Sequence, residues 1–166
     1  SEYGKGSTFW FEICFQEAAD DRRTAQIQRE QEPVLLVLEP AEVMQASLQR
    51  YLTCLGVEVD CVQDVEHLHD ALASAGSHFD GVIIDLAVGL EVVKTLLGSA
   101  SLSGAFRTHQ ILLIGSSQQR QRFNDIRVNE YPLLLKPLRF ERMRDAVETI
   151  LSEQVEKKKI PQPNPV

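Results

Sequence analysis

The feature that most constrains the fold is an alternation, between residues 33 and 151, of short apolar runs with stretches whose apolar residues recur at helical spacing. The apolar runs are continuous, which is typical of parallel strands covered on both faces. The predicted strands span 34–38, 57–62, 81–86, 111–114 and 133–135, and the predicted helices span 41–55, 64–73, 90–97, 117–127 and 140–151. Five strands alternating with five helices predict an α/β fold with a doubly wound parallel sheet and right-handed crossovers.

The segments on either side of this unit have a different character. Residues 7–15 alternate apolar and polar side chains, which predicts a half-buried strand. It has no hairpin partner nearby, so we interpret it as a strand left over from a larger domain. Residues 16–32 are polar without an apolar stripe and are predicted to be a linker, as is the proline-rich tail at 154–166. These boundaries place the folded unit at 33–153.

Charge and composition exclude some classes of function. The net charge of −7 argues against nucleic-acid binding, because phosphate binding needs a concentrated basic surface. The basic cluster, three lysines at 157–159, is interpreted as keeping the tail solvated. Cys14, Cys54 and Cys61 form no CxxC pair, which favours reduced thiols. No apolar run approaches the roughly 20 residues that span a bilayer and no signal peptide is recognisable, so a cytoplasmic domain is expected.

Polar residues stand at the carboxyl ends of four predicted strands. Glu39 follows the first, Asp85 ends the third, Ser116 follows the fourth and Lys136 follows the fifth. In a doubly wound sheet these ends meet at one edge, where ligands bind. Carboxylates can ligate Mg²⁺ there, one of them can be a nucleophile, and a lysine can neutralise a phosphoryl group. On composition alone the simpler interpretation is that these charged residues are solvated strand ends. The alternative is a phosphoryl-transfer site with Glu39 and Asp85 as metal ligands, and Asp85, Ser116 and Lys136 as catalytic positions.

The same unit resembles the receiver domains of response regulators over about residues 33–152. The segments that carry the resemblance are FDGVIID (79–85), LLLKP (133–137) and the helix ending at Leu55-Gly56. The resemblance implies a flavodoxin-like (βα)5 sheet with strand order 2-1-3-4-5. It also implies that Asp85 is the phospho-acceptor position and that Lys136 is the lysine of the site. The family has an acidic pair after the first strand and a threonine or serine after the fourth.

The opening residues, SEYGKGSTFWFE (1–12), are similar to the closing segment of histidine-kinase ATP-binding domains. A kinase end at 1–15 followed by a receiver implies a hybrid sensor histidine kinase. The combination most resembles the first, degenerate receiver of GacS/BarA-type kinases, whose parent protein would lie in the bacterial inner membrane. The implied partners are the kinase core, a downstream receiver and a phosphotransfer domain, without nucleic acid or direct membrane contact. The fragment alone is expected to have no activity, although the parent would be a protein kinase.

The first strand of the unit departs from the receiver pattern in its acidic pair. Counting back from Gly56 along an ungapped helix puts Glu39 at the first acidic position and Pro40 at the second. Proline has no side-chain oxygen for a metal. If the first helix instead contains one extra residue relative to the family, the two acidic positions fall on Leu38 and Glu39. One of the two acids is missing in that alignment as well. The sequence therefore predicts a weak or absent Mg²⁺ site.

Two further departures follow the third and fourth strands. The loop after Asp85 reaches Gly89 in four residues and lacks the family's Met-Pro and Asp-Gly pattern. Gly115 stands at the position of the hydroxyl residue, and Ser116 comes one residue later. The sequence keeps the acceptor and the lysine but loses parts of the metal site and of the hydroxyl switch.

Three functions remain open on the sequence alone. The first is a degenerate receiver, a regulatory and protein-interaction module in a two-component phosphorelay. The second is a working receiver that is phosphorylated on Asp85. The metal ligands discriminate between these two, because phosphoryl transfer between anionic groups without Mg²⁺ leaves developing charge unneutralised. The third is a small-molecule-binding flavodoxin-like domain, which needs a phosphate loop rich in glycine or hydroxyls where residues 39–42 read EPAE.

Overall fold

The computed structural model describes residues 10–12, 27, 31–75, 79–123 and 130–156, and the statements below concern that part of the chain. Its centre is a parallel sheet with the strand order β2-β1-β3-β4-β5. The strands are β1 (Val34–Leu38), β2 (Glu58–Val62), β3 (Gly81–Asp85), β4 (Ile111–Gly115) and β5 (Leu133–Leu135). The predicted doubly wound, flavodoxin-like order is confirmed.

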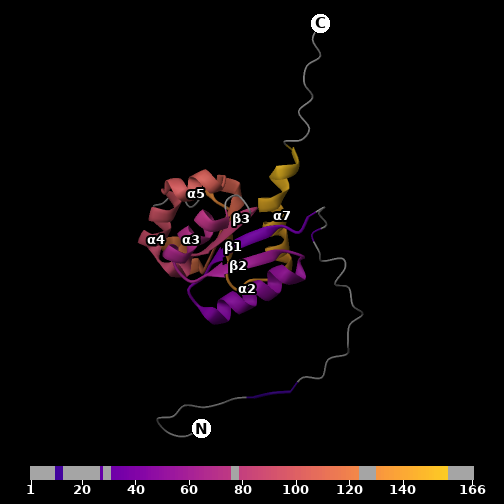
Figure 1. The fold of residues 1–166 in the computed structure, drawn as a ribbon. Helices are drawn as coiled ribbons and strands as arrows, with labels where there is room; N and C mark the ends of the chain where they lie inside the picture. The colour runs from indigo at the N-terminus through magenta and orange to yellow at the C-terminus, as the bar shows by residue number, and fades with distance from the viewer. Residues whose placement is uncertain (1–9, 13–26, 28–30, 76–78, 124–129, 157–166) are drawn as a thin grey trace.

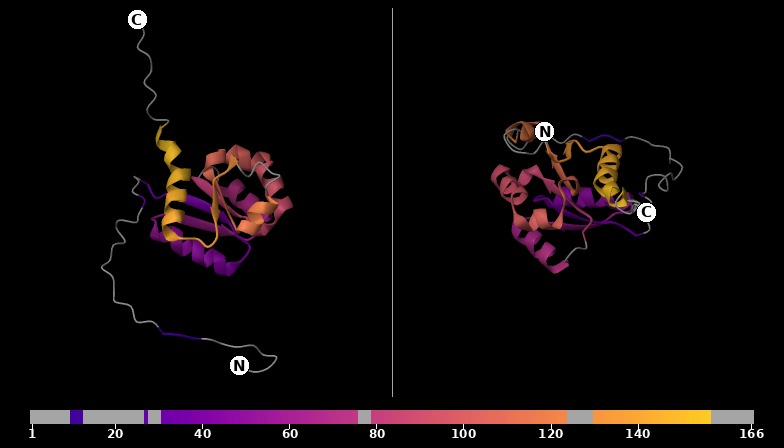
Figure 2. Two further views of the ribbon diagram at one scale, coloured as in Figure 1. Left: turned by 180° about the vertical axis from the view of Figure 1, so that it is seen from behind. Right: turned by 90° about the horizontal axis from the view of Figure 1, so that it is seen from above.

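Helices cover both faces of the sheet (Figure 1). The helices are α2 (Glu42–Cys54), α3 (Val65–Ala75), α4 (Leu90–Leu97), α5 (Ala100–Ala105), α6 (Ser117–Arg122) and α7 (Phe140–Glu156), with short 3-10 turns η1 (Leu86–Val88) and η2 (Thr108–Gln110). The helices α2 and α7 lie on one face, and α3, α4 and α5 lie on the other, as two further views show (Figure 2). No helix in the described part is long and apolar enough to cross a membrane.

The core consists of two apolar layers, one on each face of the sheet. Successive side chains of a strand point to opposite faces. In β1, Leu35 and Val37 therefore pack against α2 and α7, while Leu36 and Leu38 pack against the α3–α5 side. All four side chains are fully buried. Because both faces of the central strands are covered, their sequences are continuous apolar runs.

The helix boundaries follow local signals in the sequence. Gly56 has φ 77° and ends α2 as predicted, because glycine adopts the left-handed region without a steric penalty. Asp64 precedes α3 and its Oδ1 accepts a hydrogen bond from the backbone N–H of His67. The short helix α5 was not expected, because its sequence ASLSGA buries one large apolar side chain, Leu102, and shows no helical period. Ser99 caps it by accepting from the N–H of Leu102.

Of the predicted N-terminal strand the structure describes only residues 10–12, and these residues are in no strand. Trp10 and Phe11 are each 81% exposed. A strand is stabilised by ladder hydrogen bonds to a partner, and each strand of the sheet pairs with other strands of the folded unit. The rest of the 7–15 segment lies outside the described residues. Within the predicted linker, Ile27 packs on the α2–α7 side of the core and donates its N–H to the carbonyl of Leu55.

Candidate functional site

The carboxyl ends of β1, β3 and β5 bring together three of the four predicted site residues. Glu39 follows β1, Asp85 ends β3 and Lys136 follows β5. Both carboxyl groups are 1% exposed, and the lysine side chain is 26% exposed. The structure thus forms a buried carboxyl pair closed on the solvent side by an ammonium group.

The backbone and the side chain of Glu39 are both held by hydrogen bonds. Its backbone N–H donates to the carbonyl of Val62, which continues the β1–β2 pairing by one residue. Its Oε1 accepts from the N–H of Ala41 at 2.9 Å, and its own carbonyl accepts from the side-chain amide of Gln45 at 2.7 Å. These contacts tie the carboxyl group to the first turn of α2.

Asp85 has both carboxyl oxygens engaged. Its Oδ1 accepts a hydrogen bond of 2.9 Å from the N–H of Ala87 and so caps the η1 turn. Its Oδ2 lies 2.5 Å from Nζ of Lys136. The short loop after β3 is therefore folded back onto Asp85, where the η1 turn holds one carboxyl oxygen and the lysine holds the other.

Lys136 is positioned by the edge of the sheet and by α2. Its backbone N–H donates to the carbonyl of Gly115 at 2.8 Å, and its Nζ lies 3.8 Å from Oε2 of Glu39. The following peptide bond, to Pro137, is cis. Two residues further on, the carbonyl of Leu138 accepts a hydrogen bond from the hydroxyl of Tyr51 on α2. The lysine therefore stands in a loop that is held at both ends.

The carboxyl pair is arranged to share a proton. Burial raises the pKa of Glu39 from 4.5 to about 7, and hydrogen bonding and repulsion by Asp85 act in the same direction. The N–H of Ala41 and the charge of Lys136 oppose this shift in pKa. As bare carboxylates, Glu39 and Asp85 leave Oε2 and Oδ2 without a hydrogen-bond partner of suitable geometry among the described residues. A proton on Glu39 supplies the missing donor and leaves Asp85 and Lys136 as a neutral pair.

The side chains present fit a magnesium ion poorly. Mg²⁺ requires octahedral oxygen coordination. Glu39 and Asp85 offer oxygens, but Pro40 between them and α2 offers none, and the ammonium of Lys136 faces the same carboxyl oxygens. In the described part of the chain no group of three or more His, Cys, Asp or Glu side chains could hold a metal ion. A cation would have to displace the lysine before it could bind.

Ser116 is not brought into the carboxyl pair's hydrogen bonds. Its hydroxyl accepts from the N–H of Gln119 at 3.1 Å, and the side-chain carbonyl of Gln119 accepts from the N–H of Ser116 at 2.7 Å. This reciprocal arrangement is a capping box that starts α6. The sequence SSQQ carries that capping signal, which sequence reasoning did not use when it placed Ser116 among catalytic positions.

Gly115, at the predicted hydroxyl position, is packed against Leu86. A Cβ atom added to Gly115 would lie 2.6 Å from Cδ1 of Leu86 and 3.0 Å from its Cγ. Leu86 is 1% exposed, so it cannot move into solvent without leaving the core. The side chain that follows Asp85 therefore fills the space that a side chain at position 115 would need.

Sequence reasoning missed two residues that position the site. Gln45 binds the carbonyl of Glu39, and Tyr51 binds the loop after Lys136. Both stand on α2, where their spacing gives no sign of contacts with residues that lie far away in the sequence. The ring of Tyr51 also lies 5.9 Å from the ring of Phe140, measured between centroids. An aromatic residue on the inner face of a helix predicted packing, but not a hydrogen bond.

Comparison with known proteins identifies the fold. The structure resembles a response regulator from Thermotoga maritima (16% identity, TM-score 0.58, covering 74% of this chain and 99% of the other). It also resembles a response regulator receiver domain protein from Clostridium thermocellum (14%, 0.60, 75% and 98%). A third similar structure is the signal receiver domain of a two-component histidine kinase from Clostridium thermocellum (15%, 0.54, 73% and 98%). No protein-family model and no curated protein matches the sequence. The chain therefore has the receiver fold of two-component signalling proteins.

Proposed function

We propose that this chain is a degenerate receiver, a regulatory and protein-interaction module that does not itself accept a phosphoryl group at a useful rate. The observation that carries the proposal is the closed state of Asp85. One of its oxygens caps η1 and the other is paired with Lys136. An attacking carboxylate must present a free oxygen to phosphorus, and here both oxygens already have partners.

The metal ligands support the same function. In phosphoryl transfer a divalent cation neutralises charge that develops on the transferred oxygens. With Pro40 in place of the second acid, Glu39 and Asp85 are left to bind Mg²⁺. Because the pKa of Glu39 is raised to about 7, a proton competes with a cation for this carboxyl group near neutral pH. We infer that Mg²⁺ binding is weak or absent.

The surroundings of Gly115 favour a module without the receiver's hydroxyl switch. The site lacks a side chain at position 115, Leu86 fills the space, and the Ser116 hydroxyl is used in a helix cap. If Asp85 were phosphorylated, no hydroxyl group at position 115 could donate a hydrogen bond to the phosphoryl oxygen. The proposed role of the domain is accordingly to bind other protein domains through its surface.

The proposed parent is a hybrid sensor histidine kinase of the bacterial inner membrane, with this domain on the cytoplasmic side. Support comes from the kinase-like segment at 1–12, and from the similarity to a receiver domain of a histidine kinase. The proposed partners are the kinase core, a downstream receiver and a phosphotransfer domain. In such a chain the degenerate receiver would sit between the kinase and the true acceptor and regulate access between them.

A working receiver phosphorylated on Asp85 is the second candidate. It is favoured by one observation, the survival of the acceptor aspartate and the lysine in contact at the carboxyl end of the sheet. For this function Lys136 would have to leave Asp85 Oδ2 and turn to the incoming phosphoryl group. The two functions therefore differ in whether the ion pair opens when a phosphoryl donor and Mg²⁺ are present.

The test is phosphorylation by a small acyl phosphate in Mg²⁺, read as intact protein mass, with Asp85→Asn as the control for the site. We expect no phosphorylation of the unmodified chain. Pro40→Asp should gain the second acid and measurable phosphorylation, whereas the matched variant Pro40→Ala should not. Stoichiometric phosphorylation of the unmodified chain on Asp85 would establish the second candidate instead.

A further inference from the structure

The chain runs from Asp85 into α4 with a single residue outside regular structure. Strand β3 ends at Asp85, η1 spans Leu86–Val88, and Gly89 alone separates η1 from α4 (Leu90–Leu97). Oδ1 of Asp85 accepts a hydrogen bond of 2.9 Å from the N–H of Ala87 and caps η1. The carboxyl group at the end of β3 therefore also sets the start of the segment that leads to α4.

The hydrogen bonds continue from η1 into α4. The N–H of Gly89 donates to the carbonyl of Leu86 at 3.2 Å and closes η1. The carbonyl of Gly89 accepts from the N–H of Val93 at 3.1 Å and opens the first turn of α4. Gly89 thus ends one element and begins the next. A change in η1 therefore moves a carbonyl on which the first turn of α4 depends.

The backbone of Gly89 has the character of a hinge. Its φ of 102° and ψ of 154° lie in a region that is essentially restricted to glycine. A Cβ atom added to Gly89 would meet no heavy atom within 4 Å beyond its chain neighbours. Glycine is therefore needed for the backbone angles and not to make room for packing. Residues at the ends of elements that absorb changes in φ and ψ act as hinges in domain movements.

The connection from the carboxyl pair toward α6 is of a different kind. In the described part of the chain the hydroxyl of Ser116 is hydrogen-bonded to the N–H of Gln119 and not to the carboxyl pair. Gly115 has no side chain, and its backbone is held by pairing with β5 and by the N–H of Lys136. The packing of Leu86 beside Gly115 is apolar and does not depend on the direction of a carboxyl oxygen. The hydrogen bonds of the site therefore lead to α4 rather than to α6.

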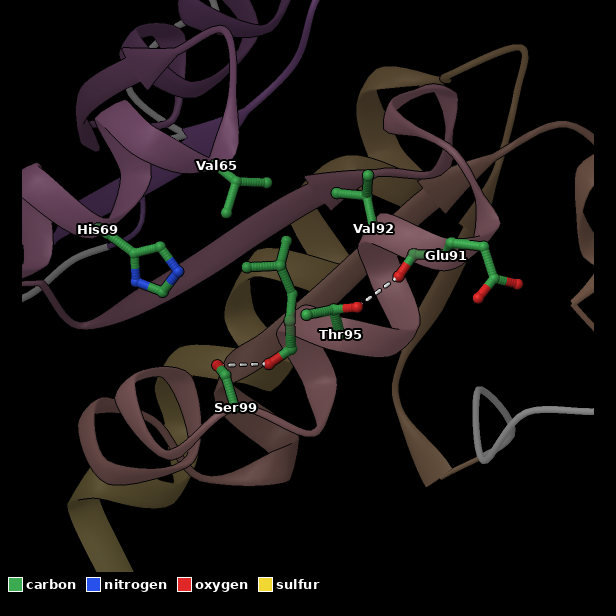
Figure 3. Close-up of a pocket in the computed structure, with 7 residues that line it drawn as sticks. Val65, His69, Glu91, Val92, Thr95 and Ser99 are labelled. Carbon is green, nitrogen blue, oxygen red and sulfur yellow. Dashed lines mark hydrogen bonds between the residues drawn. The ribbon is translucent and has the colours of Figure 1, made fainter.

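Helix α4 forms part of a surface that it shares with α3. Val92 and Thr95 of α4 and Val65 and His69 of α3 line one pocket between the two helices (Figure 3). Further along α4, Leu96 is buried in the core, so a change that arrives through Gly89 falls mainly on the first turn. Because α4 supplies one wall, a movement of this turn changes the shape of the α3–α4 surface.

We propose that Asp85 and η1 form a regulatory connection, through which the hydrogen bonding of the Asp85 carboxyl group sets the first turn of α4 and the α3–α4 surface. In the closed state Oδ1 caps η1 and Oδ2 is paired with Lys136. A ligand or partner that takes Oδ1 away from Ala87 removes the cap, and the change passes through Gly89 to α4. The connection is independent of the degenerate-receiver function, since it would serve a working receiver equally.

The experiment is amide hydrogen exchange of the full chain by NMR, with Asp85→Ala compared with Asp85→Asn. Asparagine can accept the capping hydrogen bond and alanine cannot. In Asp85→Ala we expect exchange at Val93 to become about fivefold faster, which corresponds to the loss of one cap. In Asp85→Asn, exchange at Val93 should stay within about twofold, and the methyl signals of Val92 should shift only in the alanine variant.

Two controls separate this connection from a general loss of stability. The N–H of Arg120 makes the corresponding first hydrogen bond of α6, to the carbonyl of Ser116, and its exchange should not change relative to the unmodified chain. Lys136→Met removes the ion pair but keeps the cap, so it should leave exchange at Val93 unaffected. An equal acceleration at Val93 and Arg120, or an equal effect of the alanine and asparagine variants, would overturn the proposal.

The reciprocal arm starts at the hinge and leaves Asp85 intact. Coupling between two sites acts in both directions, so Gly89→Ala, which forces the backbone out of its angles, should reach the carboxyl group. We expect shifted NMR signals for the amide of Ala87 and for the side chain of Lys136. Gly104→Ala on α5 is the matched control, because its Cβ also meets no atom within 4 Å and its φ is not positive. Unshifted Lys136 signals in Gly89→Ala would contradict the proposal, even if Asp85→Ala does not fold.

Discussion

The ammonium of Lys136 lies 2.5 Å from Oδ2 of Asp85, so the carboxyl group at the end of β3 is closed by an ion pair from the loop after the edge strand. The second carboxyl group, on Glu39, is 3.8 Å from the same nitrogen. The lysine therefore does what a bound cation does in a site with two carboxylates, since it separates like charges. With a proton on Glu39, the charges of the two carboxyl groups and the ammonium group balance without any ligand.

The first prediction is that Lys136→Met destabilises the domain. Methionine keeps much of the side-chain volume but leaves the buried Asp85 without its counter-ion, at a cost of about 1–3 kcal/mol in the free energy of unfolding. The matched control is Lys94→Met, since the Lys94–Glu91 pair is largely exposed and should contribute less than about 0.5 kcal/mol. Denaturant unfolding followed by circular dichroism measures both. Equal effects of the two variants would mean that the Lys136 pair is not a structural element.

The second prediction concerns pH. The pKa of Glu39 is raised from 4.5 to about 7 by burial and by Asp85, so the folded state binds a proton more tightly than the unfolded state. The stabilisation is complete below about pH 4.5 and is lost as pH rises to about 7, because the folded chain must then bury a second charge. The change over this window is on the order of 2–3 kcal/mol.

The matched variant for the pH prediction is Glu39→Gln. Glutamine is neutral at all these values of pH and can donate its amide toward Asp85 in place of the proton. The difference in unfolding free energy between the two proteins should grow with pH in favour of the variant. A constant difference from pH 4 to pH 8 would show that Glu39 does not hold the shared proton.

The third prediction is that Gly115→Ala is destabilising because of Leu86. The added Cβ would lie 2.6 Å from Cδ1 of Leu86, and relieving that contact in a filled core costs about 1–3 kcal/mol. Leu86→Ala alone should cost about 2–4 kcal/mol, because it leaves a cavity. The double variant should cost less than the sum by about 1 kcal/mol or more. Additive costs in a double-mutant cycle would contradict the packing described for this pair.

The fourth prediction separates the linker from the domain. Removing residues 1–25 should leave the unfolding free energy unchanged within about 0.5 kcal/mol, in keeping with the predicted start of the folded unit at residue 33. Removing residues 1–31 also takes away Ile27, which packs on the core and donates to the carbonyl of Leu55, and should cost about 1–2 kcal/mol. Loss of folding after the shorter deletion would mean that the domain begins before residue 26.

The fold was largely predictable from the sequence because the buried strands and the helix ends have recognisable sequence patterns. Strands such as Val34–Leu38 are covered on both faces and are therefore continuous apolar runs, and α2 ends at a glycine. The helix α5 was not predictable, since its burial rests on Leu102 and its start rests on a single serine cap. The sequence pattern at 7–15 predicted a strand that residues 10–12 do not form, because alternation does not supply a pairing partner.

The sequence was enough to predict which residues meet at the site, but not whether their side chains are open to a ligand or paired with one another. Strand ends place Glu39, Asp85 and Lys136 together, and topology alone suffices for that. Whether the three groups stand open for a ligand or closed on one another depends on distances of a few ångström. The capping of η1 by Asp85 and the occupation of space by Leu86 are such details. The role of Ser116 in capping α6 was not anticipated, because the sequence signal of a capping box was not weighed against that of a switch.

The most direct test of the closed site is a heteronuclear NMR titration of the full chain, first with Mg²⁺ and then with a beryllofluoride mimic of the phosphoryl group. We expect the amide signals around Asp85, Ser116 and Lys136 to remain nearly unshifted by the mimic at millimolar Mg²⁺, because the metal lacks oxygen ligands and the lysine is already paired. Large, saturable shifts of these signals at sub-millimolar Mg²⁺ would contradict the account and show that the ion pair opens to form a working acceptor site.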